Sequence, residues 1–211
     1  MKKVSKEKEL KEEILRRIRK INEDVSVLGT ELKSRRLSLS RTLCSISHQI
    51  CSISYLSKLE HNKINPNRMY INEISDKLSL SKQAVEMLMN SKSLLIDVVK
   101  AYFEKDMVVL EQIYKECEGL NNYRMILVRL IVEVSLAHYD KARAHSAKLM
   151  ELLTSMNELD LYVFSLFEGI IHFYNYEFGA AYECLDILRY CPIKGVMILI
   201  RINISFLHLK L

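Results

Sequence analysis

Apolar residues recur at intervals of three and four along most of the 211-residue chain. This spacing is typical of amphipathic helices, and only five Gly and two Pro residues are present to interrupt it. We therefore predict an all-α fold. The expected helices span residues 28–37, 43–50, 53–61, 67–79, 83–90, 92–103, 107–118, 122–137, 140–155, 160–174, 179–190 and 195–209.

The last of these ranges is ambiguous. Ile200, Ile202 and Ile204 alternate with polar residues, a pattern that also suits a strand, although the neighbouring helices favour a helix. Apolar residues continue to Leu211, so a helical repeat at this end would need either a partner subunit or further chain to cover it.

Residues 1–27 are expected to form an amphipathic helix with one narrow apolar stripe. Its apolar positions step by four, four, three, four and three: Leu10, Ile14, Ile18, Ile21, Val25 and Leu28. A stripe of this width suits a seam between two helices. It fits a contact with a second copy of the chain and packing on the chain itself equally well.

Residues 28–81 are expected to form four short helices that share one core. Helices this short are not stable alone, so their apolar positions must be buried together. These positions are Leu32, Ile46, Ile50, Leu56, Leu59, Ile71, Ile74 and Leu78. Ser52 is placed to cap the third helix, and Pro66 and Asn67 are placed to open the fourth.

From residue 82 the expected helices are longer and form pairs. The turns inside the pairs recur at 104–106, 138–140 and 176–179, and the first two are 34 residues apart. That period is typical of helical-hairpin solenoids. We therefore predict a helical repeat domain over residues 82–211.

Charge is distributed unevenly between these regions. Residues 1–81 carry 17 Lys and Arg against 10 Asp and Glu, whereas residues 82–211 carry 14 against 16. Between Lys33 and Arg68 seven basic residues face a single acidic one, Glu60. This balance is expected of a surface that binds a polyanion, although a solvated basic face would give the same count.

A longer pattern lies within the basic region. Residues 28–36 and 46–63 are followed by Pro66, and the second segment ends in Leu56-Ser57-Lys58-Leu59-Glu60-His61-Asn62-Lys63. The whole arrangement resembles the Cro/C1-type, xenobiotic-response-element (XRE) family of helix-turn-helix repressors. The resemblance covers residues 28–81 and implies a helix-turn-helix domain that binds double-stranded operator DNA.

In a helix-turn-helix, the helix that opens at Ser52 would lie in the major groove. Ile53 against a thymine methyl group, Ser54 against either base edge and Lys58 against guanine are then the candidates for base reading. Ile53 would otherwise be ordinary apolar surface. The resemblance implies that the candidate phosphate contacts are Arg36, Ser52, Lys63 and Arg68.

The second region carries a resemblance of its own. Residues 158–191 are similar to one tetratricopeptide repeat, with Gly169 at a close approach of two helices, then Ala181, then Pro192. The combination resembles peptide-sensing regulators of Gram-positive bacteria, which implies a homodimer and a short signalling peptide on the concave face. Candidates for that face, otherwise ordinary repeat core, are Tyr102, Tyr123, Tyr139, Tyr162, Phe164, Phe173, Tyr174 and Asn175.

Other classes of protein have little support in the sequence. The five cysteines are scattered and are expected to be buried, reduced and cytoplasmic: Cys44, Cys51, Cys117, Cys184 and Cys191. No signal peptide, membrane span, metal site, cofactor loop or catalytic motif is recognisable, so an enzyme is not expected. The competing reading is a protein-interaction module or antitoxin-like regulator whose helix-turn-helix does not read DNA.

Overall fold

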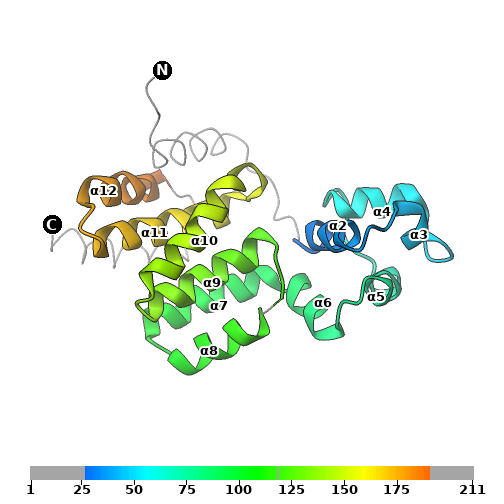
Figure 1. The fold of residues 1–211 in the computed structure, drawn as a ribbon, viewed down its shortest axis with the longest axis horizontal. Helices are drawn as coiled ribbons and strands as arrows, with labels where there is room; N and C mark the ends of the chain where they lie inside the picture. The colour runs from blue at the N-terminus through cyan, green and yellow to red at the C-terminus, as the bar shows by residue number, and fades with distance from the viewer. Residues whose placement is uncertain (1–26, 118, 191–211) are drawn as a thin grey trace, which may run out of the picture.

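The structure, a computed structural model, describes residues 27–117 and 119–190. These residues form an all-helical fold without strands, as predicted. Figure 1 shows two groups of helices side by side, α2–α6 and α7–α12, which we call the head and the repeats. The N-terminal amphipathic helix, the range 195–209 and Cys191 lie outside the described residues.

The head contains the four short helices that the sequence predicts and one more that follows them. They are α2 (Leu28–Ser38), α3 (Leu43–Ser47), α4 (Ile53–Glu60), α5 (Arg68–Lys77) and α6 (Lys82–Met89). Seven of the eight predicted core residues are buried, and Ile50 is partly buried against the same core. The predicted caps at Ser52 and Asn67 are also present, since Ser52 accepts from the Tyr55 amide and Asn67 from the Met69 amide.

Helix α3 is shorter than predicted, because it ends at Ser47 instead of residue 50. Gln49 is left-handed, with φ of 64°, which stops the helix. The Lys77 ammonium, on α5, then donates to the carbonyl oxygens of Ile46 at 3.2 Å and His48 at 2.6 Å. A cation is favourable at the C-terminal end of a helix, and here it also fixes the turn that leads into α4.

The repeats consist of three helical hairpins. They pair α7 (Ser91–Glu104) with α8 (Met107–Glu116), α9 (Tyr123–Ser135) with α10 (Tyr139–Glu151), and α11 (Glu158–Tyr174) with α12 (Phe178–Asp186). Short 3-10 turns follow the second and third pairs, at Leu153–Ser155 and Ile187–Tyr190. The predicted turn at 104–106 is confirmed, whereas the other two turns lie one or two residues before the predicted ranges, at 136–138 and 175–177. Each turn contains one left-handed residue: Lys105, Ala137 or Tyr176.

Gly169 stands at the predicted close approach of helices. A Cβ atom at this position would lie 2.8 Å from Cγ of Leu185 on α12, so only glycine lets α11 and α12 pack this closely. Ala181 on α12 is fully buried in the same region. Gly169 and Ala181 therefore allow the close packing of helices that the repeat pattern predicts.

The head and the repeats share one continuous core. Helix α6 contacts α2 and α5 on one side and α7 on the other. The buried carboxylate of Glu31 on α2 accepts hydrogen bonds at 3.0 Å from both the backbone and side-chain nitrogens of Asn122, which caps α9. The predicted domain boundary after Ser81 stays a prediction, since α6 packs on both groups.

The cysteines differ from one another in burial. Cys117 and Cys184 are buried, as predicted, but Cys44 is exposed and Cys51 is half-buried, so the prediction is wrong for these two. Both lie on the short helix α3 and its following turn, which have too little surface to bury every small residue. In the part of the chain that the structure describes, no helix has the length and apolar character needed to cross a membrane.

Candidate nucleic-acid interface

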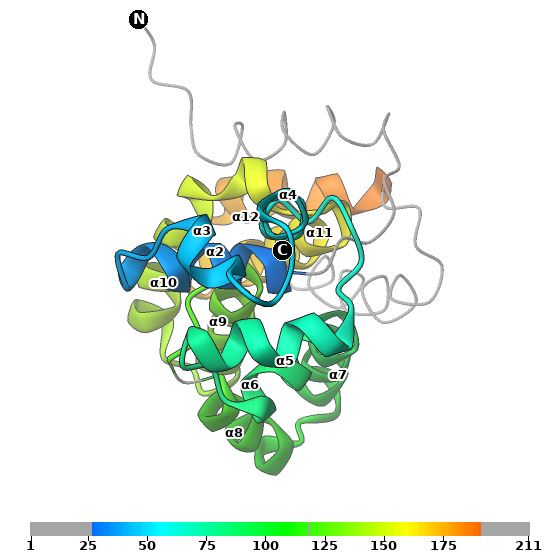
Figure 2. The same cartoon turned by 90° about the vertical axis from the view of Figure 1, so that its right-hand side faces the viewer.

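The start of α4 is exposed on the outer side of the head (Figure 2). The Ser52 hydroxyl caps the helix by accepting from the Tyr55 amide at 3.1 Å. Ser52, Ser54 and Lys58 are exposed, and Ile53 is 49% exposed. The structure therefore brings the three candidate base readers and the capping serine together on one free helix surface.

The opposite face of α4 is anchored in the core of the head. Leu56 and Leu59 are buried, because they follow the helical spacing that points away from Ser54 and Lys58. Helix α2 approaches this face so closely that a Cβ on Gly29 would lie 1.9 Å from the Leu59 carbonyl oxygen. Gly29 is therefore required for the packing of α2 on α4.

The two ends of α4 are held by side chains from neighbouring segments. Beyond its C-terminal end, Asn62 donates to the Thr30 hydroxyl of α2 at 2.8 Å. On the side of α5, the Tyr55 hydroxyl accepts from the Asn67 amide at 3.0 Å, and its ring meets that of Tyr70 edge-on. Tyr55 therefore holds the first turn of α4 against the start of α5.

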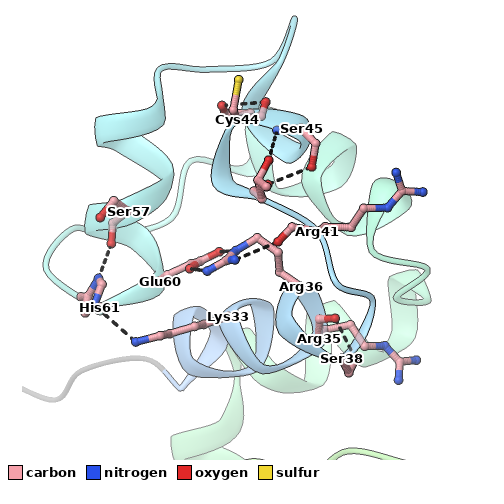
Figure 3. A network of polar contacts seen from close by, with 12 residues as sticks. Lys33, Arg35, Arg36, Ser38, Arg41, Cys44, Ser45, Ser57, Glu60 and His61 are labelled. Carbon is pink, nitrogen blue, oxygen red and sulfur yellow. Dashed lines mark hydrogen bonds and ion pairs between the residues drawn. The ribbon is translucent and has the colours of Figure 1, made fainter.

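Arg36 does not lie where a phosphate contact requires it. Its Nε and Nη2 atoms donate to the two carboxylate oxygens of Glu60, both at 2.7 Å, and Nη1 donates to the Arg41 carbonyl at 3.0 Å. The side chains of Arg36 and Glu60 are only 10% and 1% exposed. Since all three nitrogens of the guanidinium are used inside the head, we withdraw Arg36 from the candidate phosphate contacts (Figure 3).

The pair between Arg36 and Glu60 has a positioning role instead. It joins the last turn of α2 to the last residue of α4, so it fixes the orientation of α4 on the head. The hydrogen bonds that Arg36 donates to Glu60 raise the pKa of Arg36 against the opposing effect of burial. Sequence reasoning missed this role, because the two residues are 24 positions apart and Glu60 looked like an isolated acidic residue.

Burial of two carboxylates leaves the surface of α2, α3 and α4 without negative charge. Among residues 28–63 the acidic residues are Glu31 and Glu60, which are 4% and 3% exposed. Arg41, Lys58 and Lys63 are exposed over the same range. In Figure 3 the guanidinium groups of Arg35 and Arg41 point away from the polar network.

The remaining candidate phosphate contacts lie at the edges of this surface. Lys63 is exposed in the turn after α4. Arg68 begins α5, and its side chain is 75% exposed, with only a long 3.5 Å contact to Glu86. Ser52 is exposed at the start of α4. These three side chains are accessible to a large polyanion from solvent.

The aromatic candidates of the repeats divide into two sets. Tyr123, Tyr162 and Phe164 are buried, so they are ordinary repeat core, the alternative that the sequence left open for them. Asn175 is half-buried, and its side-chain amide donates to the Ile171 carbonyl at the end of α11. Residues that remain accessible are Tyr102, Tyr139, Phe173 and Tyr174.

Residues that could hold a metal were also compared in space. No group of three His, Cys, Asp or Glu side chains is arranged to bind a metal ion within residues 27–117 and 119–190.

Comparisons with known proteins give little further information. No protein-family model matches the chain, and no curated protein matches it in sequence. A solved structure similar to it is that of Bacillus thuringiensis PlcR in complex with the peptide PapR7 and DNA, at 18% identity and a TM-score of 0.33. The match covers 78% of this chain and 63% of that one, so the chain spans less than two thirds of the length of PlcR. A similarity this weak does not establish a shared family or a shared function.

Proposed function

We propose that this chain is a sequence-specific DNA-binding transcriptional regulator that places the start of α4 in the major groove of an operator. The observation that carries the proposal is the exposed start of α4 beside a basic surface formed by residues 28–63, within which both carboxylates, Glu31 and Glu60, are buried. The major groove admits one α-helix, and a basic surface without opposing charge favours a polyanion. A protein-interaction helix would not need that charge separation.

In this proposal Ile53, Ser54 and Lys58 read bases. Ile53 would contact a thymine methyl group, which gives its exposed side chain an apolar partner. Ser54 would bond to a base edge, and Lys58, one turn further along α4, would donate to guanine. All three side chains are exposed on the same stretch of helix, which is the arrangement such contacts need.

Backbone contacts would come from Ser52, Lys63 and Arg68. These contacts carry no sequence information but set the register of the protein on the duplex. Each basic contact releases counterions, so the affinity should fall steeply with salt. Arg41 is a further exposed cation on the same part of the head and replaces Arg36 in this role.

We also propose that the chain acts as a cytoplasmic homodimer. Two heads would meet successive major grooves about 34 Å apart on an operator with two-fold symmetry. The repeats would set the spacing of the heads, and a short signalling peptide that binds one dimer geometry better than another would regulate it. The continuous core between head and repeats supports this, because a rigid connection can transmit a change in geometry.

Selection of genomic DNA fragments by the purified protein tests this function. The proposal predicts a palindromic consensus, whereas an interaction module or antitoxin-like regulator would enrich no sequence. Ser54→Ala should change the preferred base at one position of each half-site. Ser155→Ala, an exposed serine in the repeats, is the matched control and should leave the consensus unchanged. Enrichment of no sequence by the wild-type protein would refute the proposal.

A further inference from the structure

A pocket of about 510 Å³ opens at the edge of the repeats, away from the proposed DNA surface. It lies where the turn between α7 and α8 meets the turn between α9 and α10, at one edge of the repeats in Figure 1. Its volume lies within the range of small-molecule sites, roughly 300–1,000 Å³. The residues that line it are Tyr102, Phe103, Lys105, Met107, Leu110, Val134, Ser135, Ala137, Tyr139 and Tyr174.

Three tyrosines from three hairpins form the aromatic wall of the pocket. Tyr139 of α10 stacks on Tyr174 of α11 with 5.0 Å between ring centroids. Tyr102 of α7 meets Phe167 of α11 edge-on at 4.9 Å, which fixes its ring. Burial raises the pKa of Tyr102, and the nearby Tyr174 and Tyr139 raise it further. Its hydroxyl therefore stays protonated and can donate a hydrogen bond.

The charge of the pocket is positive. Of the described residues that line it, Lys105 alone is charged at neutral pH, and no carboxylate is among them. The backbone of Lys105 occupies the left-handed position of the turn, where the Asp106 amide donates to the Ala101 carbonyl at 2.9 Å, and the Lys105 side chain is exposed at the rim of the pocket. The other side chains, Met107, Leu110 and Val134 among them, are mainly apolar. A neutral hydrocarbon would leave the ammonium without a partner in the site, whereas a ligand with an anionic group would pair with it.

We infer that this pocket binds a small apolar carboxylate, with its hydrocarbon part among Tyr102, Tyr139 and Tyr174 and its carboxylate against Lys105. Aromatic walls give such a ligand a large apolar contact, and a single cation at the rim fixes its orientation. The tyrosines come from three successive hairpins, so the ligand would bridge all three.

Calorimetric titration of the full chain, without DNA, tests the inference with three probes of one shape: 3-phenylpropionate, its amide 3-phenylpropionamide, and phenethylamine. The carboxylate should bind about tenfold more tightly than the amide, because only the carboxylate forms an ion pair with the Lys105 ammonium, and the amine should bind most weakly because its charge is repelled by that ammonium. Absence of binding by 3-phenylpropionate would overturn the inference. Since no DNA is present, that failure is independent of the proposed function.

Variants test the anion site at Lys105 and the apolar wall at Tyr139 separately. Lys105→Gln should abolish the preference for the carboxylate over the amide, while Lys100→Gln, which removes an exposed lysine of α7 outside the pocket, should keep it. Tyr139→Ala should weaken both probes by a similar factor, with the thermal unfolding midpoint measured to show that the variant is folded. A preference that survives Lys105→Gln would overturn the assignment of the anion site.

The same chemistry also occurs at the C-terminus of a short apolar peptide. Acetyl-Ala-Ala-Phe with a free carboxylate is therefore compared with its C-terminal amide. Weaker binding of this peptide than of 3-phenylpropionate supports a small-molecule ligand. Binding of the peptide alone, with no binding of 3-phenylpropionate, would overturn it.

Discussion

The head and the repeats each contain one buried arginine–carboxylate pair, but the two pairs differ in their surroundings. Arg36 of α2 binds Glu60 at the C-terminal end of α4, and Arg36 keeps 10% of its side chain exposed. Arg124 and Asp160 lie deep in the repeats, with 1% and 0% exposure. The first pair positions one surface helix, whereas the second holds the interior of a stack of helices.

The surroundings of the second pair explain its role. Arg124 of α9 donates from Nε and Nη2 to Asp160 of α11, at 2.8 to 3.1 Å. Its Nη1 atom donates to Ser91 at the start of α7, at 3.0 Å. The pair therefore ties the N-terminal ends of three helices together. The buried ion pair of the repeats holds three helices together. The buried ion pair of the head keeps a carboxylate away from the surface around α4.

The largest effect is expected from Arg124→Ala. This change leaves the Asp160 carboxylate buried without its cation, which costs about 3–5 kcal/mol of the free energy of unfolding. Urea denaturation measures the loss. Arg124→Met combined with Asp160→Asn is the control and should lose less than Arg124→Ala, because no charge is then left buried. A loss below about 1 kcal/mol for Arg124→Ala would contradict the role assigned to the pair.

Arg36→Ala is expected to lower the free energy of unfolding by about 2–3 kcal/mol, less than Arg124→Ala. The Arg36 side chain is slightly exposed, so water can reach the Glu60 carboxylate once Arg36 is removed. Glu60→Ala should destabilise the head similarly, and both variants should bind every DNA sequence more weakly because α4 is no longer held. Urea denaturation and DNA affinity are measured on both. If Arg36 instead contacted phosphate, Glu60→Ala would leave the salt dependence of DNA binding unchanged while Arg36→Ala alone reduced it.

The smallest effect concerns a more exposed cluster in the repeats, where His172 lies near Glu168 and Glu177. The hydrogen bond with Glu168 raises the pKa of His172 above its ordinary 6.5, burial opposes this, and Glu177 adds to it. Protonated His172 therefore stabilises the fold at pH values below 6.5, and the contribution disappears as the pH rises through the raised pKa.

His172→Gln tests this contribution. The variant should lose a few tenths to about 1 kcal/mol at pH 5.5, the value of a partly exposed ion pair, and almost nothing at pH 9. Urea denaturation of wild type and variant at both pH values measures the difference. Arg143, which also contacts Glu177, stays charged at both values, so it does not change the comparison. An equal loss at both pH values would show that packing, and not the charge of His172, matters here.

Local signals in the sequence were enough to predict much of the fold. Ser52, Asn67 and Asn122 each cap the helix that follows, because a cap depends only on residues two or three positions away. The hairpin turns follow from the spacing of the apolar residues in the same way. The exposed start of α4 was predictable because its polar face and its buried Leu56 and Leu59 alternate with helical spacing.

Features that depend on distant residues were not predictable. The turn that ends α3 early is fixed by Lys77, which lies 31 positions beyond Ile46. Arg36 was assigned to phosphate because nothing near it in sequence reveals its partner Glu60. For Tyr162 and Phe164 the sequence left both a ligand-binding face and the repeat core open, because α11 is buried around most of its circumference and its apolar spacing does not tell one face from another.

The central claim is that the start of α4 and its basic surroundings bind the DNA duplex. The salt dependence of binding to a selected operator fragment tests it most directly, with Lys148→Ala, an exposed lysine of α10, as control. The slope of log affinity against log salt should decrease in magnitude by about one for Lys63→Ala and stay unchanged for Lys148→Ala. An unchanged slope for Lys63→Ala, or no complex with any duplex at low salt, would contradict the claim.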